Sequence, residues 1–235
     1  MEKPIYPLRN MRITQRYGEG THVNSFAIDD AGKDTGIEDV YAPFTGTIKK
    51  IYPQDANEVW LESDNPVEYP DGTIDYMTIL FAHANDISNL YVGKKIRKKE
   101  AFYKEGTSGN ATGNHCHIEC AKGKYQSPGW TANPEGYYVI INGKNPEECL
   151  WIEDETNIIN SNGYNFKKIT EENTNTKPEE DSNIEHLEPL PEQPNDEEEN
   201  SNLENQETLP KLIYTCPKDD LYGIYLKEGE QLYLK

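Results

Sequence analysis

Short apolar runs separated by turns constrain the fold of this chain more than any other feature. Between residues 5 and 152 they include "VYAPFTGTIKKIY", "EVWLES", "DYMTILFAHA", "NHCHIECA" and "GYYVIING". The runs are rich in Val, Ile, Tyr, Thr and Trp, and turns such as "DG" and "NG" divide them. Long segments with helical periodicity are absent from the sequence. The pattern therefore predicts an all-β domain built on an antiparallel β-sheet or sandwich.

A strongly acidic segment predicts where that domain ends. Between residues 170 and 210 there are 14 acidic residues and one Lys, so −13 of the formal net charge of −19 lies there. Such a segment buries too little apolar surface to offset its chain entropy. We therefore expect a folded domain over residues 1–155 and a disordered linker rich in Glu, Asn and Pro over 156–210. Residues 211–235 are predicted to form a short C-terminal β hairpin that docks on another surface.

Charge and composition exclude several classes of protein. With 42 acidic and 23 basic residues, the chain is not expected to bind nucleic acid or anionic lipid. Its first 20 residues lack the apolar run of a signal peptide or membrane anchor. We therefore expect a protein made in the cytoplasm, without membrane insertion. Four cysteines are too few and too scattered for a disulfide framework, and we interpret them as reduced.

The segment "TGNHCHIEC", residues 112–120, carries two imidazoles inside a short apolar strand. Successive side chains of a strand point to opposite faces. One face therefore receives His115, His117 and Glu119, whereas the other receives Cys116, Ile118 and Cys120. A zinc site built from the two cysteines is not expected, because they face away from the histidines and lack a second CxxC pair.

Two further histidines and several carboxylates complete the candidate chemistry. His22 precedes a short apolar strand, and His83 ends the apolar run "TILFAHA". A buried imidazole without a partner is unfavourable, and a metal ion would satisfy several at once. Carboxylate candidates for the same site are Asp29, Asp30, Glu119 and several loop acids. Strand alternation favours Asp29 as a site residue, whereas we interpret Asp30, on the other face, as solvated.

These motifs together resemble a known family. In order along the chain stand "ITQRYGEGTH", "FAID", "YAPFTGTIKKI", "YMTILFAHA", "VGKKIRKKEAFYKEGTSGNATGNHCHIE" and "NPEECLW". Over residues 10 to 152 they are similar to the lysostaphin-type (LytM-like) zinc endopeptidases, most specifically in "GTSGNATGNHCHIE". The resemblance implies zinc ligands at His22, Asp29 and His117. It implies catalytic histidines at His83 and His115, and bacterial peptidoglycan peptides as substrate.

Two positions depart from the usual family pattern. His22 and Asp29 are seven residues apart rather than four, which is similar to the spacing in phage-encoded members. On one straight strand that separation would put them on opposite faces, so a turn at "VNS" must bring His22 round. Cys116 stands where the family usually has Leu, and it faces the apolar side, where a small thiol is conservative.

The chemistry of such a site predicts a division of roles. Zinc polarises the scissile carbonyl and lowers the pKa of water, so that it provides both Lewis acid and nucleophile. Histidine has a pKa suited to proton transfer near neutrality. We expect His115 to act as general base and His83 to stabilise the oxyanion. The sequence leaves open whether the two exchange roles, and which peptidoglycan bond is cut.

The expected function is therefore that of a zinc metalloendopeptidase that opens the cell wall. Without a signal peptide, it fits a virion-associated (tail) enzyme or a phage lysis protein, with residues 211–235 binding phage tail proteins. One alternative is a catalytically silent structural or wall-binding module of the same fold, in a virion or a division complex. Another is an intracellular metal-binding protein unrelated to cell walls. The filled ligand positions disfavour the first alternative, and the ordered motifs disfavour the second.

Overall fold

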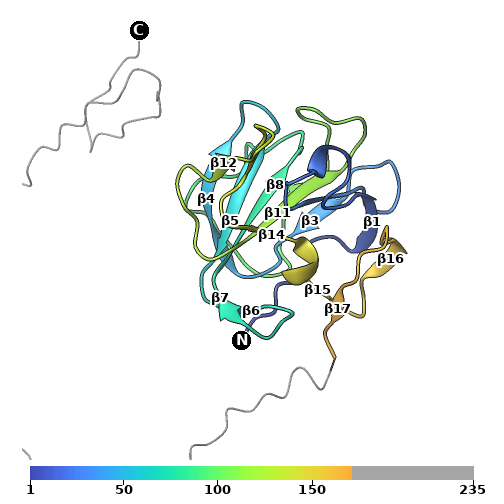
Figure 1. Cartoon of the computed structure of the whole chain (residues 1–235), viewed down its shortest axis with the longest axis vertical. Coiled ribbons are helices and arrows are strands. Elements are labelled where there is room, and N and C mark those ends of the chain that lie inside the picture. Colours follow the sequence, from blue (N-terminus) through green and yellow to red (C-terminus); the bar gives the residue numbers. More distant parts are fainter. Residues whose placement is uncertain (171–235) are drawn as a thin grey trace, which may run out of the picture. The chain divides into compact units, whose positions relative to one another are not determined.

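A mixed β-sheet forms the centre of the domain in the structure, a computed structural model that describes residues 1–170. Within these residues the main sheet has nine strands in the order β16-β1-β2-β11-β8-β5-β4-β9, with β14 also paired to β11 (Figure 1). The bounds are β1 Asn10–Gln15, β2 Ala27–Asp30, β4 Gly46–Tyr52, β5 Glu58–Ser63, β8 Met77–Ala82, β9 Lys95–Ile96, β11 Cys116–Lys122, β14 Gly143–Lys144 and β16 Asn157–Asn160.

Shorter paired strands and two 3₁₀ turns surround this sheet. The pairs are β3 Asp39–Tyr41 with β10 Ala101–Lys104, β6 Val67–Glu68 with β7 Ile74–Asp75, β12 Trp130–Ala132 with β13 Tyr138–Ile140, and β15 Trp151–Ile152 with β17 Lys167–Lys168. The 3₁₀ turns are η1 Gly20–His22 and η2 Pro146–Glu148. The all-β prediction is confirmed, but the sheet is mixed because β16 runs parallel to β1.

The two faces of the main sheet differ in what covers them. On β11, Cys116, Ile118 and Cys120 are fully buried and belong to the large hydrophobic core, so we call their side the core face. His117 and Glu119 lie on the opposite side, which we call the histidine face. A smaller cluster lies on the histidine face and contains Trp60, Leu80, Ala121 and Ile140, with Tyr52, Tyr125 and Trp130 packed against it. The predicted alternation along this strand is therefore confirmed.

One residue of the core face corrects the sequence analysis. Asp30 was expected to be solvated, and that expectation is wrong because the side chain is fully buried. It pairs with Cys116 on the neighbouring strand and follows the same alternation into the interior. The Arg12 backbone N–H donates to Asp30 Oδ1 at 2.7 Å, and burial raises the pKa of this carboxyl to about 7.

Part of the segment predicted as a linker is paired with the domain. Strand β16 pairs with β1, and β17 pairs with β15, so regular structure extends to Lys168. Phe166 packs edge-on against Tyr6, with ring centroids 5.6 Å apart. Residues 171–210 of the predicted linker, and the predicted hairpin at 211–235, lie outside the described residues.

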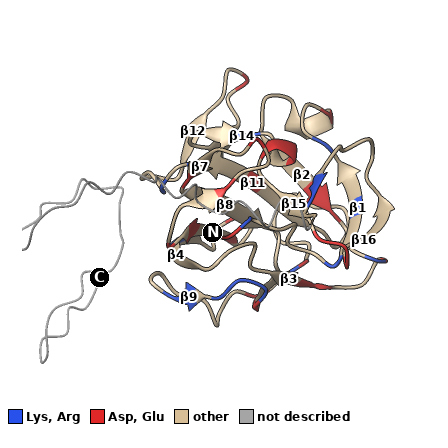
Figure 2. Ribbon diagram, turned by 90° about the horizontal axis from the view of Figure 1, so that it is seen from below, with Lys and Arg blue, Asp and Glu red and all other residues tan. Residues whose placement is uncertain are grey.

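Charges of both signs are distributed along the described domain (Figure 2). Ion pairs between them include Lys3 with Glu68 and Lys99 with Glu153. In residues 1–170, no helix has the length and apolar character needed to span a bilayer. Among residues 1–170, Cys116, Cys120 and Cys149 are buried and free, and Cys216 lies outside the described residues.

Candidate metal centre

Three side chains that are distant in sequence converge on the histidine face. Strands β11 and β2 pair His117 directly with Asp29, and η1 brings His22 beside them. Asp29 Oδ1 lies 3.0 Å from His117 Nδ1 and 3.4 Å from His22 Nε2. One potential ligand atom from each residue lies within 4.8 Å of the other two. The three side chains could therefore hold a metal ion.

A tight turn places His22 in this group. The His22 carbonyl oxygen accepts hydrogen bonds from the backbone N–H groups of Gly18 and Ser25, at 3.0 and 3.2 Å. Asn24 follows with φ of +60°, a left-handed conformation that Asn tolerates better than most residues. The chain therefore reverses between His22 and β2, as the seven-residue spacing to Asp29 requires.

The charges of Asp29 and His117 support each other. Burial by itself would raise the pKa of Asp29, but hydrogen bonds from His117 and His22 hold it well below its usual value. Burial would lower the pKa of His117, yet contacts with Asp29 and Glu119 raise it to about 10. Without a metal, an imidazolium thus lies between two carboxylates. A metal ion bound at His117 Nδ1 would take the place of the proton on that nitrogen.

Glu119 contributes to the site in a way that the sequence did not predict. Its Oε1 lies 3.2 Å from His117 Nε2, on the side of the ring away from Asp29. Its Oε2 accepts a hydrogen bond from the Ile140 backbone N–H at 2.6 Å. The sequence placed Glu119 among the possible ligands. The only feature of the sequence that indicated its contact with His117 was that both residues lie on the same face of the strand. In the structure Glu119 contacts the ring nitrogen of His117 that faces away from Asp29, and a proton held on Nε2 would leave Nδ1 free for a metal ion.

The two remaining histidines lie at the edge of the same group. His115 Nε2 is 3.6 Å from Asp29 Oδ1, and the ring centroids of His83 and His115 are 4.6 Å apart. His83 Nδ1 lies 2.7 Å from the Ser108 carbonyl oxygen, and His115 Nδ1 lies 2.8 Å from that of Gly113. A carbonyl oxygen can only accept, so both Nδ1 atoms carry protons, and Nε2 is the nitrogen of each ring that is left for proton exchange.

The Gly-rich turn holds these two histidines together. Gly106 and His115 exchange two backbone hydrogen bonds of 3.1 Å. A Cβ on Gly106 would collide with the His83 carbonyl oxygen, so only glycine fits between the two histidines. His83 itself has φ of +82°, which is unusual for a residue with a side chain. Burial and the nearby His117 lower the pKa of His83 to about 4.

The donor set agrees with zinc. Two imidazole nitrogens and one carboxylate oxygen are ligands that this ion accepts, and three protein ligands are typical of sites that leave a position open. The remaining nitrogen of His117 has a carboxylate partner of the kind that often orients metal-binding histidines. The residues present therefore fit the metal that the sequence predicted.

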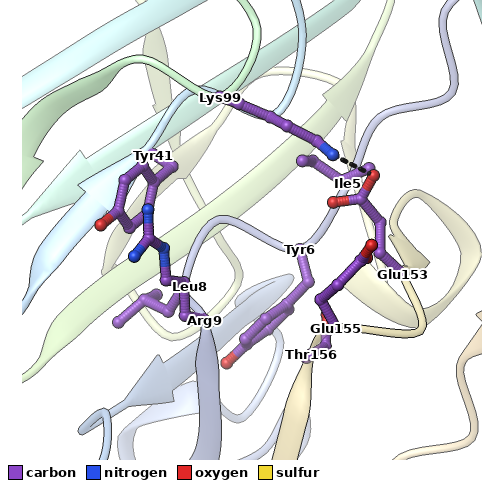
Figure 3. A pocket seen from close by; sticks show the side chains of 9 residues that line it. All are labelled: Ile5, Tyr6, Leu8, Arg9, Tyr41, Lys99, Glu153, Glu155 and Thr156. Atoms are coloured by element: carbon purple, nitrogen blue, oxygen red, sulfur yellow. Dashed lines mark ion pairs between the residues drawn. The ribbon is translucent and has the colours of Figure 1, made fainter.

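A separate pocket of about 430 Å³ contains none of the five predicted site residues. Figure 3 shows its lining: Ile5, Tyr6, Leu8, Arg9, Tyr41, Lys99, Glu153, Glu155 and Thr156. Lys99 and Glu153 form an ion pair of 2.7 Å in it, and the Arg9 guanidinium lies 4.6 Å from the ring centroid of Tyr41. It contains no imidazole, and its carboxylates, those of Glu153 and Glu155, do not belong to any converging group of three metal-binding residues among residues 1–170, so we do not consider it the site of chemistry.

Comparison with known proteins gives a phage relative. The chain is 32% identical over 165 residues to Morphogenesis protein 1 of Bacillus phage B103. The alignment covers 69% of this chain but 43% of the phage protein, so the chain spans less than half the length of this curated relative. No protein-family model matches the chain.

Solved structures give a second comparison. The chain matches the structure of LytU with a TM-score of 0.40 and 19% identity, over 58% of this chain and 82% of LytU. It also matches the catalytic domain of the antimicrobial peptidase lysostaphin from Staphylococcus simulans, with a TM-score of 0.38 and 17% identity, over 49% and 84% of the two chains. The domain is similar in fold to the lysostaphin-type (M23) peptidases. Because these scores and identities are low, we base function on the side chains of the site.

Proposed function

We propose that this chain is a zinc-dependent endopeptidase that hydrolyses peptide bonds of bacterial peptidoglycan. The observation that carries the proposal is the convergence of His22, Asp29 and His117, with two further histidines beside them. Three ligands alone would suit many metal-binding proteins. The two additional imidazoles, each with its Nδ1 proton held by a carbonyl oxygen, add the groups that hydrolysis requires for proton transfer.

In the proposed reaction, His22, Asp29 and His117 hold a zinc ion that supplies a Lewis acid for the scissile carbonyl and makes an attacking water more acidic. The chain's own groups supply the remaining steps. The Gly113 carbonyl oxygen fixes the proton of His115 on Nδ1, so its Nε2 can accept a proton from the attacking water. Glu119 keeps the ring of His117 in one orientation throughout.

His83 is proposed to stabilise the oxyanion that forms as the carbonyl is attacked. Its contact with Ser108 keeps a proton on Nδ1, so a neutral His83 has a lone pair on Nε2. Its lowered pKa keeps the ring neutral near pH 7. Donation to an oxyanion would require a second proton on Nε2. The same holds for His115, whose Nδ1 also carries its proton, so these contacts do not separate this assignment from the reverse one, in which His83 is the base and His115 the donor.

The similarity to a phage morphogenesis protein supports a role in phage particles. We propose that the enzyme is carried by the virion or released at lysis to open the cell wall. Attachment to phage tail proteins through residues 211–235 remains part of the proposal, and it lies outside the described residues. The competing function is a silent structural module of the same fold, which would need none of the five ionisable side chains.

Metal analysis and an activity assay on one preparation separate these functions. Purified full chain should contain about one zinc per molecule and release soluble fragments from purified peptidoglycan. Chelation should abolish that release, and added zinc should restore it. A folded protein that carries zinc without releasing fragments would instead favour the silent module. A protein without zinc and without activity would overturn the proposal altogether.

A further inference from the structure

The hairpin of β12 and β13 is held against the metal centre by Glu119. Within the hairpin, Trp130 pairs with Ile140. The Ile140 N–H donates to Glu119 Oε2 at 2.6 Å, while Glu119 Oε1 lies 3.2 Å from His117. A single buried carboxylate therefore contacts both a candidate ligand and the hairpin. The position of the hairpin relative to the site is thereby set.

The loop at the tip of the hairpin contacts the segment that follows His22. Asn24 Nδ2 donates to Glu135 Oε1 at 2.6 Å, and Asn133 Nδ2 donates to the Asn24 carbonyl oxygen at 3.5 Å. Through these contacts the hairpin lies beside two of the three candidate ligands, His117 and His22. It forms a wall along the part of the histidine face where a substrate would lie.

A row of paired residues leads from the metal centre across the floor beneath this wall. Glu119 pairs with Leu80, Leu80 pairs with Trp60, and Trp60 pairs with Lys50. The row crosses three gaps between neighbouring strands, each of about 4.8 Å, so its two ends are about 14 Å apart. An extended peptide covers that distance with about four residues. A group attached to a short substrate peptide would reach the far end of the row.

Aromatic side chains are clustered at that far end. The ring of Trp130 lies 4.9 Å from that of Tyr52 and 6.0 Å from that of Tyr138. The Lys50 ammonium lies 3.0 Å from the ring centroid of Trp130. Tyr138 is 73% exposed, and Tyr52 and Trp130 are half-buried. We call Tyr52, Trp130, Tyr138 and Lys50 the aromatic platform.

The charges around the aromatic platform favour a neutral ligand. Burial lowers the pKa of Lys50 to about 8, while the nearby Glu58 carboxylate acts in the opposite direction. The ammonium also donates to the Pro128 carbonyl oxygen at 2.5 Å. One of its three donors is therefore in use, and its charge is opposed by a carboxylate. The platform combines ring faces with a few polar groups, as small-ligand sites commonly do.

We propose that the aromatic platform binds a neutral N-acetylhexosamine ring of the glycan to which the cleaved peptide is attached. The flat C–H face of such a sugar matches an aromatic ring, and its hydroxyl and amide oxygens can accept from Lys50. This inference rests on the proposed function, because it names a second part of the same substrate. A peptide segment bound at the same place is the competing occupant.

The test is a titration of the full chain with a peptide-free N-acetylglucosamine trimer. Tryptophan fluorescence reports the binding, because Trp130 belongs to the aromatic platform. Tyr138→Ala should weaken binding about fivefold to tenfold, the range expected for one lost aromatic contact. Tyr138→Phe, which keeps the ring, should bind as the unmodified chain does. Tyr137→Ala is the matched control, because Tyr137 is the neighbouring exposed tyrosine, at 58% exposure.

A cleavage assay separates this inference from the proposed function. Tyr138→Ala should lower kcat/KM on sugar-bearing peptidoglycan fragments and leave it unchanged on the same peptides without sugar. A chain that cleaves peptides but does not bind the trimer, or binds it regardless of Tyr138, overturns the sugar site and leaves the peptidase intact. An equal decrease of kcat/KM on both substrates in Tyr138→Ala would identify a peptide segment as the occupant. Trimer binding that depends on Tyr138, in a chain without hydrolysis, would support the sugar site and refute the peptidase.

Discussion

The two faces of strand β11 differ sharply, because one short segment carries both a buried apolar row and a polar row with the candidate ligand His117. On the core face, Cys116, Ile118 and Cys120 are fully buried among apolar side chains. On the histidine face, the alternate residues His117 and Glu119 contact each other and polar neighbours. Residues one position apart therefore have opposite environments. Substitutions on the histidine face should alter metal binding and catalysis, whereas substitutions on the core face should alter stability.

The largest effect is expected from His117→Ala, because it removes one of the three candidate ligands. Bound zinc should fall below stoichiometric amounts, and activity on peptidoglycan should fall by more than about 100-fold, the upper range for residues that only orient a ligand. Zinc content and fragment release, measured on one preparation, check both. Lys122→Ala on the same strand is the control and should change neither. Full zinc content in His117→Ala would contradict the ligand assignment.

His115→Ala tests the division between metal binding and proton transfer on the histidine face. The variant should keep its zinc, because His115 is not among the three converging donors. Its rate should fall by about two orders of magnitude or more, as expected when a general base is removed. Asn114→Ala, one residue away, should cleave normally. Loss of zinc together with activity would instead make His115 a ligand.

A smaller change is expected from Glu119→Gln. The amide can still accept a proton from His117, but its NH₂ group then faces the Ile140 N–H, and two donors oppose each other. Zinc affinity should fall by about 10-fold to 100-fold, which titration with a competing chelator can measure. Glu62→Gln is a matched control, because Glu62 also accepts a backbone N–H, from Tyr125, at 2.6 Å. An equal decrease of zinc affinity in Glu119→Gln and Glu62→Gln would argue against an orienting role for Glu119.

The core face is tested by the pH dependence of stability. Glu105 is fully buried, and burial, with the nearby carboxylates of Asp30 and Glu38, raises its pKa to about 8, against the hydrogen bond from the Glu38 backbone N–H and the charge of Arg12. The folded protein therefore holds this proton more tightly than the unfolded chain does. The stability that this provides is complete below about pH 4.5 and is lost as the pH rises toward 8.

Glu105→Gln should therefore remove part of this pH dependence. The amide oxygen can still accept from the Glu38 N–H, as the carboxylate does at 2.9 Å. Between pH 5 and 8, the unmodified chain should lose about 3 kcal/mol more of its unfolding free energy than the variant. Denaturant titrations at the two pH values check this. Parallel losses in both proteins would show that Glu105 does not hold a proton in the folded state.

Several features of the candidate site could be predicted from local sequence. Alternation alone assigned the residues of β11 to their faces, because the side-chain period of a strand is two. The spacing between His22 and Asp29 predicted the turn that the structure contains, since a straight strand would separate them. The same reasoning failed for Asp30. It was assigned correctly to the opposite face, but alternation does not say whether that face meets water or a core.

Other features depended on contacts between distant segments. The position of the Glu119 carboxylate depends on the Ile140 N–H, which lies 21 positions further along the chain. The parallel pairing of β16 with β1 has no local signature, since exposed residues around Ile158 resemble a polar connection. A hairpin can be predicted from its turn, but the surface against which it packs cannot. This is why the wall formed by β12 and β13 was not predicted.

The sequence by itself determined the all-β character, the candidate ligands and the faces to which they belong, because strand period and turn residues act locally. Tertiary structure decided that Asp29 lies beside both His117 and His22, and that Glu119 contacts the other ring nitrogen of His117. It also decided the tautomers of His83 and His115, through carbonyl oxygens in the Gly-rich turn. The physical reason is that a hydrogen bond forms only when its donor and acceptor atoms lie about 3 Å apart. In a sheet, those positions are set by strands far apart in the chain.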